Sequence, residues 1–304
     1  MTEQVNTNGK SWSTRAREFV RVSSFLLNPK RGRADLLYEL ASTDNYLTEK
    51  TLFRNVGWWK DGPTTLDDAC KALAHVAAER LELGPEDRLL DVGFGYGDQD
   101  MYWKERFQPR EIVGINITKS QIDMARQRVA ERGMTGVTFQ MGQATKMPFP
   151  DNSFDKVVAL ESAFHFDTRE DFFGEAFRVL RPGGRLVTLD ILAQPYDHLS
   201  FWNRMMSSIG LHFWKTSPEN VYPREVYEDK LRGKGFNARV ESVFEHTLVP
   251  FARYTVAELA KPDVAKRFNA TVAGLLQIPS EVVLGNPHGL LNLDYVLAVA
   301  DKPA

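Results

Sequence analysis

Short apolar runs alternate with amphipathic stretches through the middle of this chain. The run at 89–92 (LLDV) leads into a glycine-rich turn, and 156–160 (KVVAL) is a second run of the same kind. Consecutive apolar positions indicate strands that are buried on both faces. Between the runs, apolar residues follow helical spacing, as at Ile122, Ala125 and Val129. Strands and helices in alternation, with short connections, predict a parallel sheet covered by helices on both faces.

The same patterning predicts the order of the elements. Helices are expected over 66–83, 119–132, 169–180 and 224–234, and strands over 89–92, 111–117, 137–141, 156–160, 185–191, 238–244 and 293–299. We therefore predict an α/β fold built on a Rossmann-like, seven-stranded, mostly parallel sheet.

Three parts of the chain differ in their patterning. We expect an N-terminal helical lid over 1–63, a Rossmann-like core over 64–194, and a substrate cap with the last strands of the sheet over 195–304. Within this third part, about residues 249–290 lie between two predicted strands and carry helical spacing. That segment is predicted to be a helical cap insertion.

Composition and charge exclude several classes of protein. The formal net charge of −2 over 304 residues gives no indication of nucleic acid or of a membrane surface as a partner. The single cysteine, Cys70, rules out an intrachain disulfide and a cysteine-rich metal site. No apolar run has the length of a membrane span or of a signal peptide. We expect a cytoplasmic protein with a small-molecule substrate and no metal; a homodimer stays open.

The turn after the first strand is the clearest chemical signal. Gly93, Gly95 and Gly97 alternate with other residues directly after the strand that carries Asp91. Glycines at such positions let the backbone approach a ligand where a Cβ would clash. Dinucleotide folds use G-x-G-x-x-G, but the position of their third glycine is occupied here by Asp98. The spacing therefore favours a nucleotide-type ligand other than a dinucleotide.

Several motifs together narrow the ligand further. They are LLDVGFGYG at 89–97, GQATKMPFPDNSFD at 142–155 and FRVLRPGG at 177–184. In this order they resemble the class I methyltransferases that use S-adenosylmethionine. The stretch at 36–62 (LLYELASTDNYLTEKTLFRNVGWWKDG) and ESAFHF at 161–166 resemble the branch of macrolide-sugar O-methyltransferases of the erythromycin type, with sterol C-methyltransferases as more distant relatives.

The resemblance implies S-adenosyl-L-methionine as the cofactor and S-adenosyl-L-homocysteine as its product. Asn116 lies where a ribose-binding side chain belongs, although the family usually has a carboxylate there. A tryptophan of the Trp58-Trp59 pair is expected near the sulfonium, since aromatic faces attract cations. The predicted cofactor-binding residues are Asp91, Gly93, Gly95, Gly97, Asn116, Ile117, Gln121, Gln143, Ala144, Glu161 and Trp59.

A hydroxyl that accepts a methyl group must lose its proton, so a base is expected at the same edge of the sheet. His165 follows the fourth strand and is the first candidate, because histidine titrates near neutral pH. Glu161 and Asp190, at the tips of two strands, are the other candidates. The residues expected to line the acceptor site are Phe164, Phe201, Trp202, Met205 and Tyr254.

Three hypotheses about function stay open at this point. The first is O-methylation of a hydroxyl on a bulky, largely apolar natural product. The second is C-methylation of an isoprenoid double bond through a carbocation, which aromatic side chains would stabilise. The third is a non-catalytic protein that binds S-adenosylmethionine.

Overall fold

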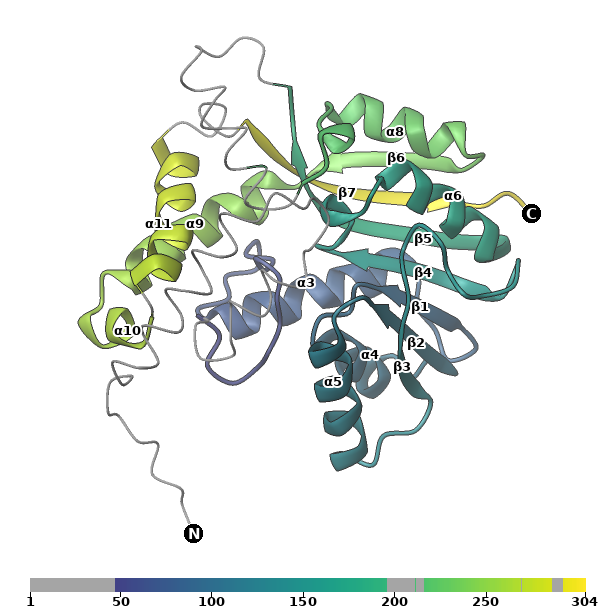
Figure 1. The fold of residues 1–304 in the computed structure, drawn as a ribbon, viewed down its shortest axis with the longest axis horizontal. Coiled ribbons are helices and arrows are strands. Elements are labelled where there is room, and N and C mark those ends of the chain that lie inside the picture. The colour runs from purple at the N-terminus through teal and green to yellow at the C-terminus, as the bar shows by residue number, and fades with distance from the viewer. Residues whose placement is uncertain (1–46, 196–210, 212–215, 269, 286–291) are drawn as a thin grey trace.

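The sheet and its covering helices are seen in a computed structural model (Figure 1), which describes residues 47–195, 211, 216–268, 270–285 and 292–304. The N-terminal half of the described chain alternates strands and helices as α3 (Leu66–Leu81), β1 (Arg88–Val92), α4 (Asp98–Arg106), β2 (Glu111–Asn116), α5 (Lys119–Glu131), β3 (Val137–Met141), β4 (Phe154–Leu160), the short 3₁₀ helix η1 (Ala163–His165), α6 (Arg169–Val179) and β5 (Leu180–Ala193).

The C-terminal half completes the sheet and adds three helices between its last strands. Its elements are η2 (Pro218–Asn220), α8 (Arg224–Gly233), β6 (Asn237–Ser242), η3 (Phe244–His246), α9 (Leu248–Leu259), α10 (Pro262–Arg267), α11 (Ala270–Gly285) and β7 (Leu293–Asp301).

The seven strands form one sheet in the order β3-β2-β1-β4-β5-β7-β6. The β1–β2, β1–β4, β2–β3 and β4–β5 pairs are parallel, whereas β7 runs antiparallel to both β5 and β6. The chain order reverses beside β1, so the carboxyl ends of β1 and β4 border a crevice where α/β sheets bind ligands. The predicted Rossmann-like, mostly parallel sheet is confirmed.

Apolar side chains of the central strands pack on both faces of the sheet. In β1, Leu89 points into one buried cluster together with Leu73 of α3, while Leu90 belongs to a second cluster with Phe172 of α6. All four side chains are fully buried. This two-sided burial explains why the strands lack a polar alternation. Thr65 caps α3, since its side chain accepts a hydrogen bond from the backbone N–H of Asp68.

One strand is longer than the sequence pattern predicts. The RPGG motif was expected to separate a helix from a strand at 185–191, but β5 begins at Leu180, which pairs with Phe154. Lys302, directly after β7, holds the glycines of the motif through its backbone: Gly183 N–H donates to its carbonyl at 3.0 Å, and its own N–H donates to Gly184 O at 2.8 Å. A contact with a segment more than a hundred residues away thus extends the strand.

Helices α9, α10 and α11 lie beyond one end of the sheet, beside α3 (Figure 1). Ala252 of α9 and Leu66 of α3 belong to the same buried cluster, which ties the insertion to the core. The helical character expected for 249–290 is therefore observed for α9 to α11. Most of the predicted lid over 1–63 lies outside the described residues, which begin at 47.

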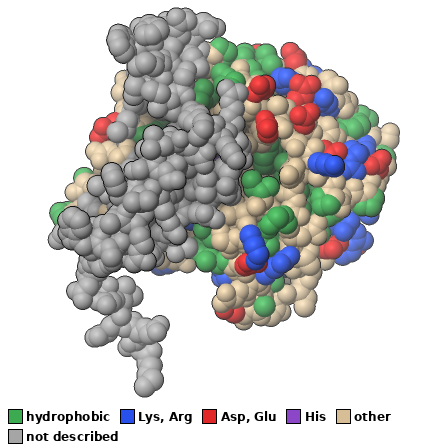
Figure 2. All heavy atoms as spheres, viewed as in Figure 1, with side chains coloured by type: hydrophobic (Ala, Val, Ile, Leu, Met, Phe, Trp, Pro, Cys, Tyr) green, Lys and Arg blue, Asp and Glu red, His purple; other side chains and the backbone are tan. Residues whose placement is uncertain are grey.

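On the described part of the face shown in Figure 2, Lys and Arg side chains are interspersed with Asp and Glu. The mixed surface agrees with the formal net charge of −2. Among the described helices, none has the length and apolar character needed to cross a membrane.

Candidate active site

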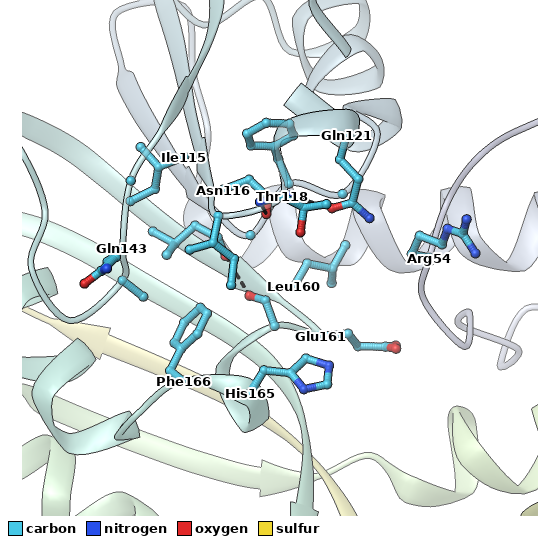
Figure 3. A pocket seen from close by; sticks show the side chains of 18 of the residues that line it. Arg54, Ile115, Asn116, Thr118, Gln121, Gln143, Leu160, Glu161, His165 and Phe166 are labelled. Carbon is cyan, nitrogen blue, oxygen red and sulfur yellow. Dashed lines mark hydrogen bonds between the residues drawn. The ribbon is translucent and has the colours of Figure 1, made fainter. Parts of the chain in front are cut away.

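A cavity of about 310 Å³ opens at the carboxyl ends of the central strands. Its walls combine the glycine turn after β1, the ends of β2 and β4, η1 and a short segment before α3. The lining residues are Leu52, Arg54, Asn55, Val92, Gly93, Phe94, Gly95, Tyr96, Gln99, Ile115, Asn116, Ile117, Thr118, Gln121, Gly142, Gln143, Ala144, Thr145, Leu160, Glu161, Ser162, His165, Phe166 and Asp167. Figure 3 shows labelled side chains of this wall, with Gln143 and Arg54 at opposite sides of the view. The cavity therefore extends from the loop after β3 to the segment before α3.

Two glycines of the turn are required by close packing. A Cβ on Gly93 would lie 2.4 Å from the Cβ of Ser162, and its φ of +90° is one that other residues rarely adopt. A Cβ on Gly97 would lie 2.8 Å from the ring of Phe139. Both glycines let the turn pack closely, against Ser162 after β4 and against Phe139 of β3, and the backbone from Gly93 to Tyr96 lines the cavity. Gly97 is also the N-cap of α4, whose free N–H groups face the same turn.

Two side-chain amides predicted separately as ribose ligands form a pair in the structure. Asn116 Nδ2 donates to Gln121 Oε1 at 2.8 Å, and Asn116 Oδ1 accepts from the N–H of Thr118 at 3.1 Å. Gln121 Nε2 is buried and finds no hydrogen-bond partner among the described residues. A buried donor without a hydrogen-bond partner costs free energy, so a ligand oxygen that binds Gln121 Nε2 in the cavity would recover that cost. Gln143, Ala144 and Ile117, also predicted as cofactor ligands, line the same cavity.

The segment 52–56, called here the strap, closes one side of the cavity. Side-chain carboxyl groups hold its backbone at both ends: Leu52 N–H donates to Asp98 at 3.2 Å, and Val56 N–H donates to Glu161 at 2.9 Å. Asp98 is itself fixed by a salt bridge to Arg128. The strap brings Arg54 to the cavity, where its guanidinium donates to Tyr96 Oη at 3.2 Å.

Glu161 is at the tip of β4 in an uncommon backbone conformation, with φ +50°. Its Oε1 accepts from Val56 N–H and, at 2.7 Å, from Tyr295 Oη on β7. Burial raises the pKa of Glu161 to about 8, against the opposing effect of these two hydrogen bonds. The side chain therefore lines the cavity mostly as a neutral acid at neutral pH, and it anchors the strap.

His165 lies at the end of η1 and lines the cavity near Glu161 and Phe166 (Figure 3). Its ring packs against that of Phe164, with the centroids 3.9 Å apart and the planes tilted by 39°. Phe164 itself is buried and does not contribute to the cavity wall. The structure thus brings His165 and Glu161 together with the glycine turn, as the sequence predicted.

Asp190 has a different position from the one expected of a base. It is fully buried, does not line the cavity, and forms an ion pair with Arg169 at 2.6 Å. Asp91 is likewise buried behind the cavity wall, where Gln99 Nε2 donates to it at 3.0 Å. Burial raises the pKa of Asp91 to about 7. Asp91 therefore does not line the cavity itself; it accepts a hydrogen bond from Gln99, which does.

The aromatic residues predicted for the site are distributed differently. Trp59 donates its indole N–H to Val56 O at 2.8 Å and packs on Tyr254, with ring centroids 5.1 Å apart. Neither ring lines the cavity, so this pair joins the strap to α9 instead. The expectations for Phe201, Trp202 and Met205 fall outside the described residues.

Several cavity residues were missed by sequence reasoning. A partial signal existed for some of them, because Tyr96 lies within the glycine turn, Gln99 follows it closely, and Phe166 belongs to the ESAFHF motif. Arg54 and Asn55 lie in a stretch without periodic spacing, so no local pattern indicates that their side chains line a cavity. In the described part of the chain, no cluster of three or more His, Cys, Asp or Glu side chains is arranged for a metal ion.

Comparison with known proteins agrees with this geometry. A family model described as a methyltransferase domain matches residues 90–188. Erythromycin 3''-O-methyltransferase of Saccharopolyspora erythraea is 36% identical over 289 residues, which are 89% of this chain and 90% of that protein. The 27-O-demethylrifamycin SV methyltransferase of Amycolatopsis mediterranei is 32% identical over 258 residues, 81% and 89% of the two chains.

A solved structure shares the fold. It is the geranyl diphosphate C-methyltransferase of Streptomyces coelicolor A3(2), in complex with Mg²⁺, geranyl diphosphate and S-adenosyl-L-homocysteine, with a TM-score of 0.65, 21% identity and coverage of 89% of this chain and 98% of that one. The protein belongs to the class I S-adenosylmethionine-dependent methyltransferases. Within that class it is an enzyme of the macrolide O-methyltransferase branch, whose members methylate natural products.

The residues of the cavity fit this cofactor. The glycine turn leaves room and backbone N–H groups for the methionine part, and the guanidinium of Arg54 stands on the cavity wall as a partner for a carboxylate. Gln121 Nε2 and Asn116 would offer amide groups to the ribose hydroxyls of a bound cofactor, and Ile117, Gln143 and Ala144 would border its adenine. The fit rests on Gln121 Nε2, a buried donor without a hydrogen-bond partner among the described residues, and on the close packing of the turn against Ser162 and Phe139, which only glycines at positions 93 and 97 allow.

Proposed function

We propose that this methyltransferase moves a methyl group to a hydroxyl oxygen of a bulky, largely apolar natural product, with His165 as the general base. The observation that carries the proposal is that His165 lines the same cavity as the glycine turn and the Asn116–Gln121 amide pair. A base and a cofactor site that share one cavity can act on one acceptor.

The cofactor supplies a methyl group bonded to a sulfonium sulfur, which keeps the electron pair of the broken carbon–sulfur bond. An imidazole nitrogen of neutral His165 accepts the proton of the acceptor hydroxyl as the oxygen–carbon bond forms. A base held in this way contributes about 10²–10⁴-fold to the rate. The ring of Phe164 packs against the His165 ring, with the centroids 3.9 Å apart, and so restricts the rotation of the imidazole.

Glu161 and Asp190 are assigned other roles. The carboxyl group of Glu161 holds the strap through Val56 and binds Tyr295, and burial raises its pKa to about 8. It is a weak acceptor for a hydroxyl proton while it is neutral. Asp190 is held by Arg169 in the core, away from the cavity wall. His165 is therefore preferred as the base.

The acceptor class follows from the relatives. The two curated relatives described above are named for erythromycin and rifamycin, and the match to each covers more than four-fifths of this chain. We infer an acceptor of comparable bulk that carries a free hydroxyl. Phe201, Trp202, Met205 and Tyr254 stay predictions for its binding surface.

The acceptor class is tested with isotopically methyl-labelled S-adenosylmethionine and two panels of acceptors. One panel holds macrolide glycosides and ansamycins with a free hydroxyl, and the other holds isoprenoid diphosphates. A labelled methyl ether, located by mass spectrometry and NMR, supports the proposal. A labelled methyl group on a new carbon–carbon bond would establish C-methylation in its place.

The base is tested with His165→Ala. Turnover should fall at least about 100-fold, while the affinity for the cofactor, measured by calorimetry, should stay within about twofold. His75→Ala is the matched control, because His75 is on α3, hydrogen-bonded to Tyr102, and does not line the cavity. Normal turnover of the His165 variant with bound cofactor would exclude this histidine as the base.

A further inference from the structure

The backbone on both sides of His165 is held by buried side chains. On one side, the N–H of Phe164 donates to Asp190 Oδ1 at 3.1 Å. On the other, the carbonyl of Phe166 accepts from Asn220 Nδ2 at 2.8 Å. His165 is the residue between these two contacts, so its Cα has little freedom to move.

Arg169 joins the two contacts into one network. Its Nε donates to Asp190 Oδ2 at 2.6 Å, and its Nη1 donates to the backbone carbonyl of Asn220 at 2.6 Å. The backbone N–H of Arg169 also donates to Asn220 Oδ1 at 2.9 Å. Both ends of the Asn220 side-chain amide are thereby assigned: its oxygen accepts from Arg169 and its nitrogen donates to Phe166.

All three network residues are completely buried. Arg169, Asp190 and Asn220 have 0% exposure, and none of them lines the cavity. The rings of Tyr222 and Tyr227 lie over the guanidinium of Arg169, with its Cζ 5.5 and 5.6 Å from their centroids. A buried ion pair is an expensive way to gain stability, because both charges lose their hydration. Its hydrogen bonds have a fixed geometry, which suits the placement of a neighbouring group.

We propose that Asp190, Arg169 and Asn220 are positioning residues, which hold the η1 loop on both sides of His165 and so set where its imidazole meets the acceptor. This inference rests on the proposed function, since it assigns a task to the residues around the base. It also gives Asp190 a part in the reaction that differs from that of a base.

Asn220→Asp tests the network at the contact with Phe166. The substitution keeps the side-chain volume and the acceptor for Arg169, but it replaces the donor by an oxygen that repels the Phe166 carbonyl. A displacement of about 1 Å at a reacting group can lower a rate by about 10²-fold. We expect kcat to fall about 10- to 100-fold, with the dissociation constant for the cofactor and KM for the acceptor changed by no more than about threefold.

Thr188→Val is the control for a loss of stability without a loss of positioning. Thr188 is on β5 near Asp190, and its Oγ1 shares a buried hydrogen bond of 2.8 Å with Tyr227 Oη. Valine has a similar volume, so the variant loses a buried hydrogen bond without touching the η1 loop. We expect a lower Tm and an unchanged kcat. Asn220→Ser provides a second variant at the network if Asn220→Asp does not fold.

A double-mutant cycle with His165→Ala separates positioning from structural damage. If Asn220 acts through His165, Asn220→Asp should have almost no further effect on kcat in the His165→Ala background. The same fold-loss in both backgrounds would overturn the inference, as would full turnover of a folded Asn220→Asp protein. Wild-type turnover of His165→Ala alone would refute the proposed base, an outcome that the cycle distinguishes from failure of the network.

Discussion

Glu161→Gln should make the protein more resistant to unfolding at alkaline pH. Glutamine keeps the shape of the side chain and an acceptor oxygen for Val56 N–H and Tyr295 Oη, which in the wild type both bind Glu161 Oε1. It removes only the carboxyl group that can ionise. The substitution therefore isolates the cost of a buried negative charge at the cavity wall.

The magnitude follows from the pKa of this group. Burial raises the pKa of Glu161 from 4.5 to about 8, so the folded protein keeps a proton that the unfolded chain has lost over this interval. Because the unfolded state binds fewer protons there, the stability of the wild type falls as pH rises. Between about pH 5 and about pH 8, this group should cost the wild type about 3 kcal/mol relative to the glutamine variant.

The measurement is urea unfolding of both proteins without cofactor at several pH values. The difference in the free energy of unfolding should be small near pH 5 and should grow toward pH 8. Asp91 and Asp100, whose pKa values burial also raises, are present in both proteins and cancel in the difference. Glu105→Gln, at an exposed position on α4, should give a flat difference. A flat difference for Glu161→Gln as well would mean that the carboxyl group is already ionised in the folded protein.

Two further predictions concern the cofactor site. Gly93→Ala should lower cofactor affinity at least about 100-fold or prevent folding, because the new Cβ would meet Ser162 at 2.4 Å. Gly133→Ala is the control, since Gly133 also has a positive φ but has open space around it; it should lose about 1 kcal/mol of stability and keep its affinity for the cofactor. Calorimetry measures the affinity, and thermal unfolding measures the stability. Gln121→Met should weaken cofactor binding about tenfold, since it removes the buried amide donor offered to the ligand but keeps the side-chain length. If methionine binds the cofactor as tightly as glutamine does, Gln121 does not contact the ribose.

Local patterns predicted the sheet well for a physical reason. Burial on both faces forces strands such as 89–92 to be apolar throughout, and helices between them need one apolar stripe. The glycine turn was equally visible, because only glycine combines positive φ with close packing against Ser162. Asn116 was predicted as a ribose ligand from its distance along the chain; it lines the cavity, and its hydrogen bond to Gln121 was not expected.

The Trp58-Trp59 pair shows that local patterns do not predict which side chains of a loop line the cavity. Trp59 was expected beside the sulfonium, but its indole packs on Tyr254 while Arg54 of the same segment lines the cavity. The direction of the strap is set by the contact of Val56 with Glu161, 105 residues further along the chain. No local spacing contains that information.

The class of fold, the glycine turn and the two groups after β4, Glu161 and His165, could be predicted without a structure, because each depends on residues close together in the chain. The protonation and the contacts of these groups depend on the folded protein. Burial keeps Glu161 protonated near neutral pH as the anchor of the strap. Arg169 removes Asp190 from the cavity and, through Asn220, ties both sides of the His165 loop to the core. Charge, hydration and hydrogen bonding depend on what folding brings together, and those partners are far apart in the sequence.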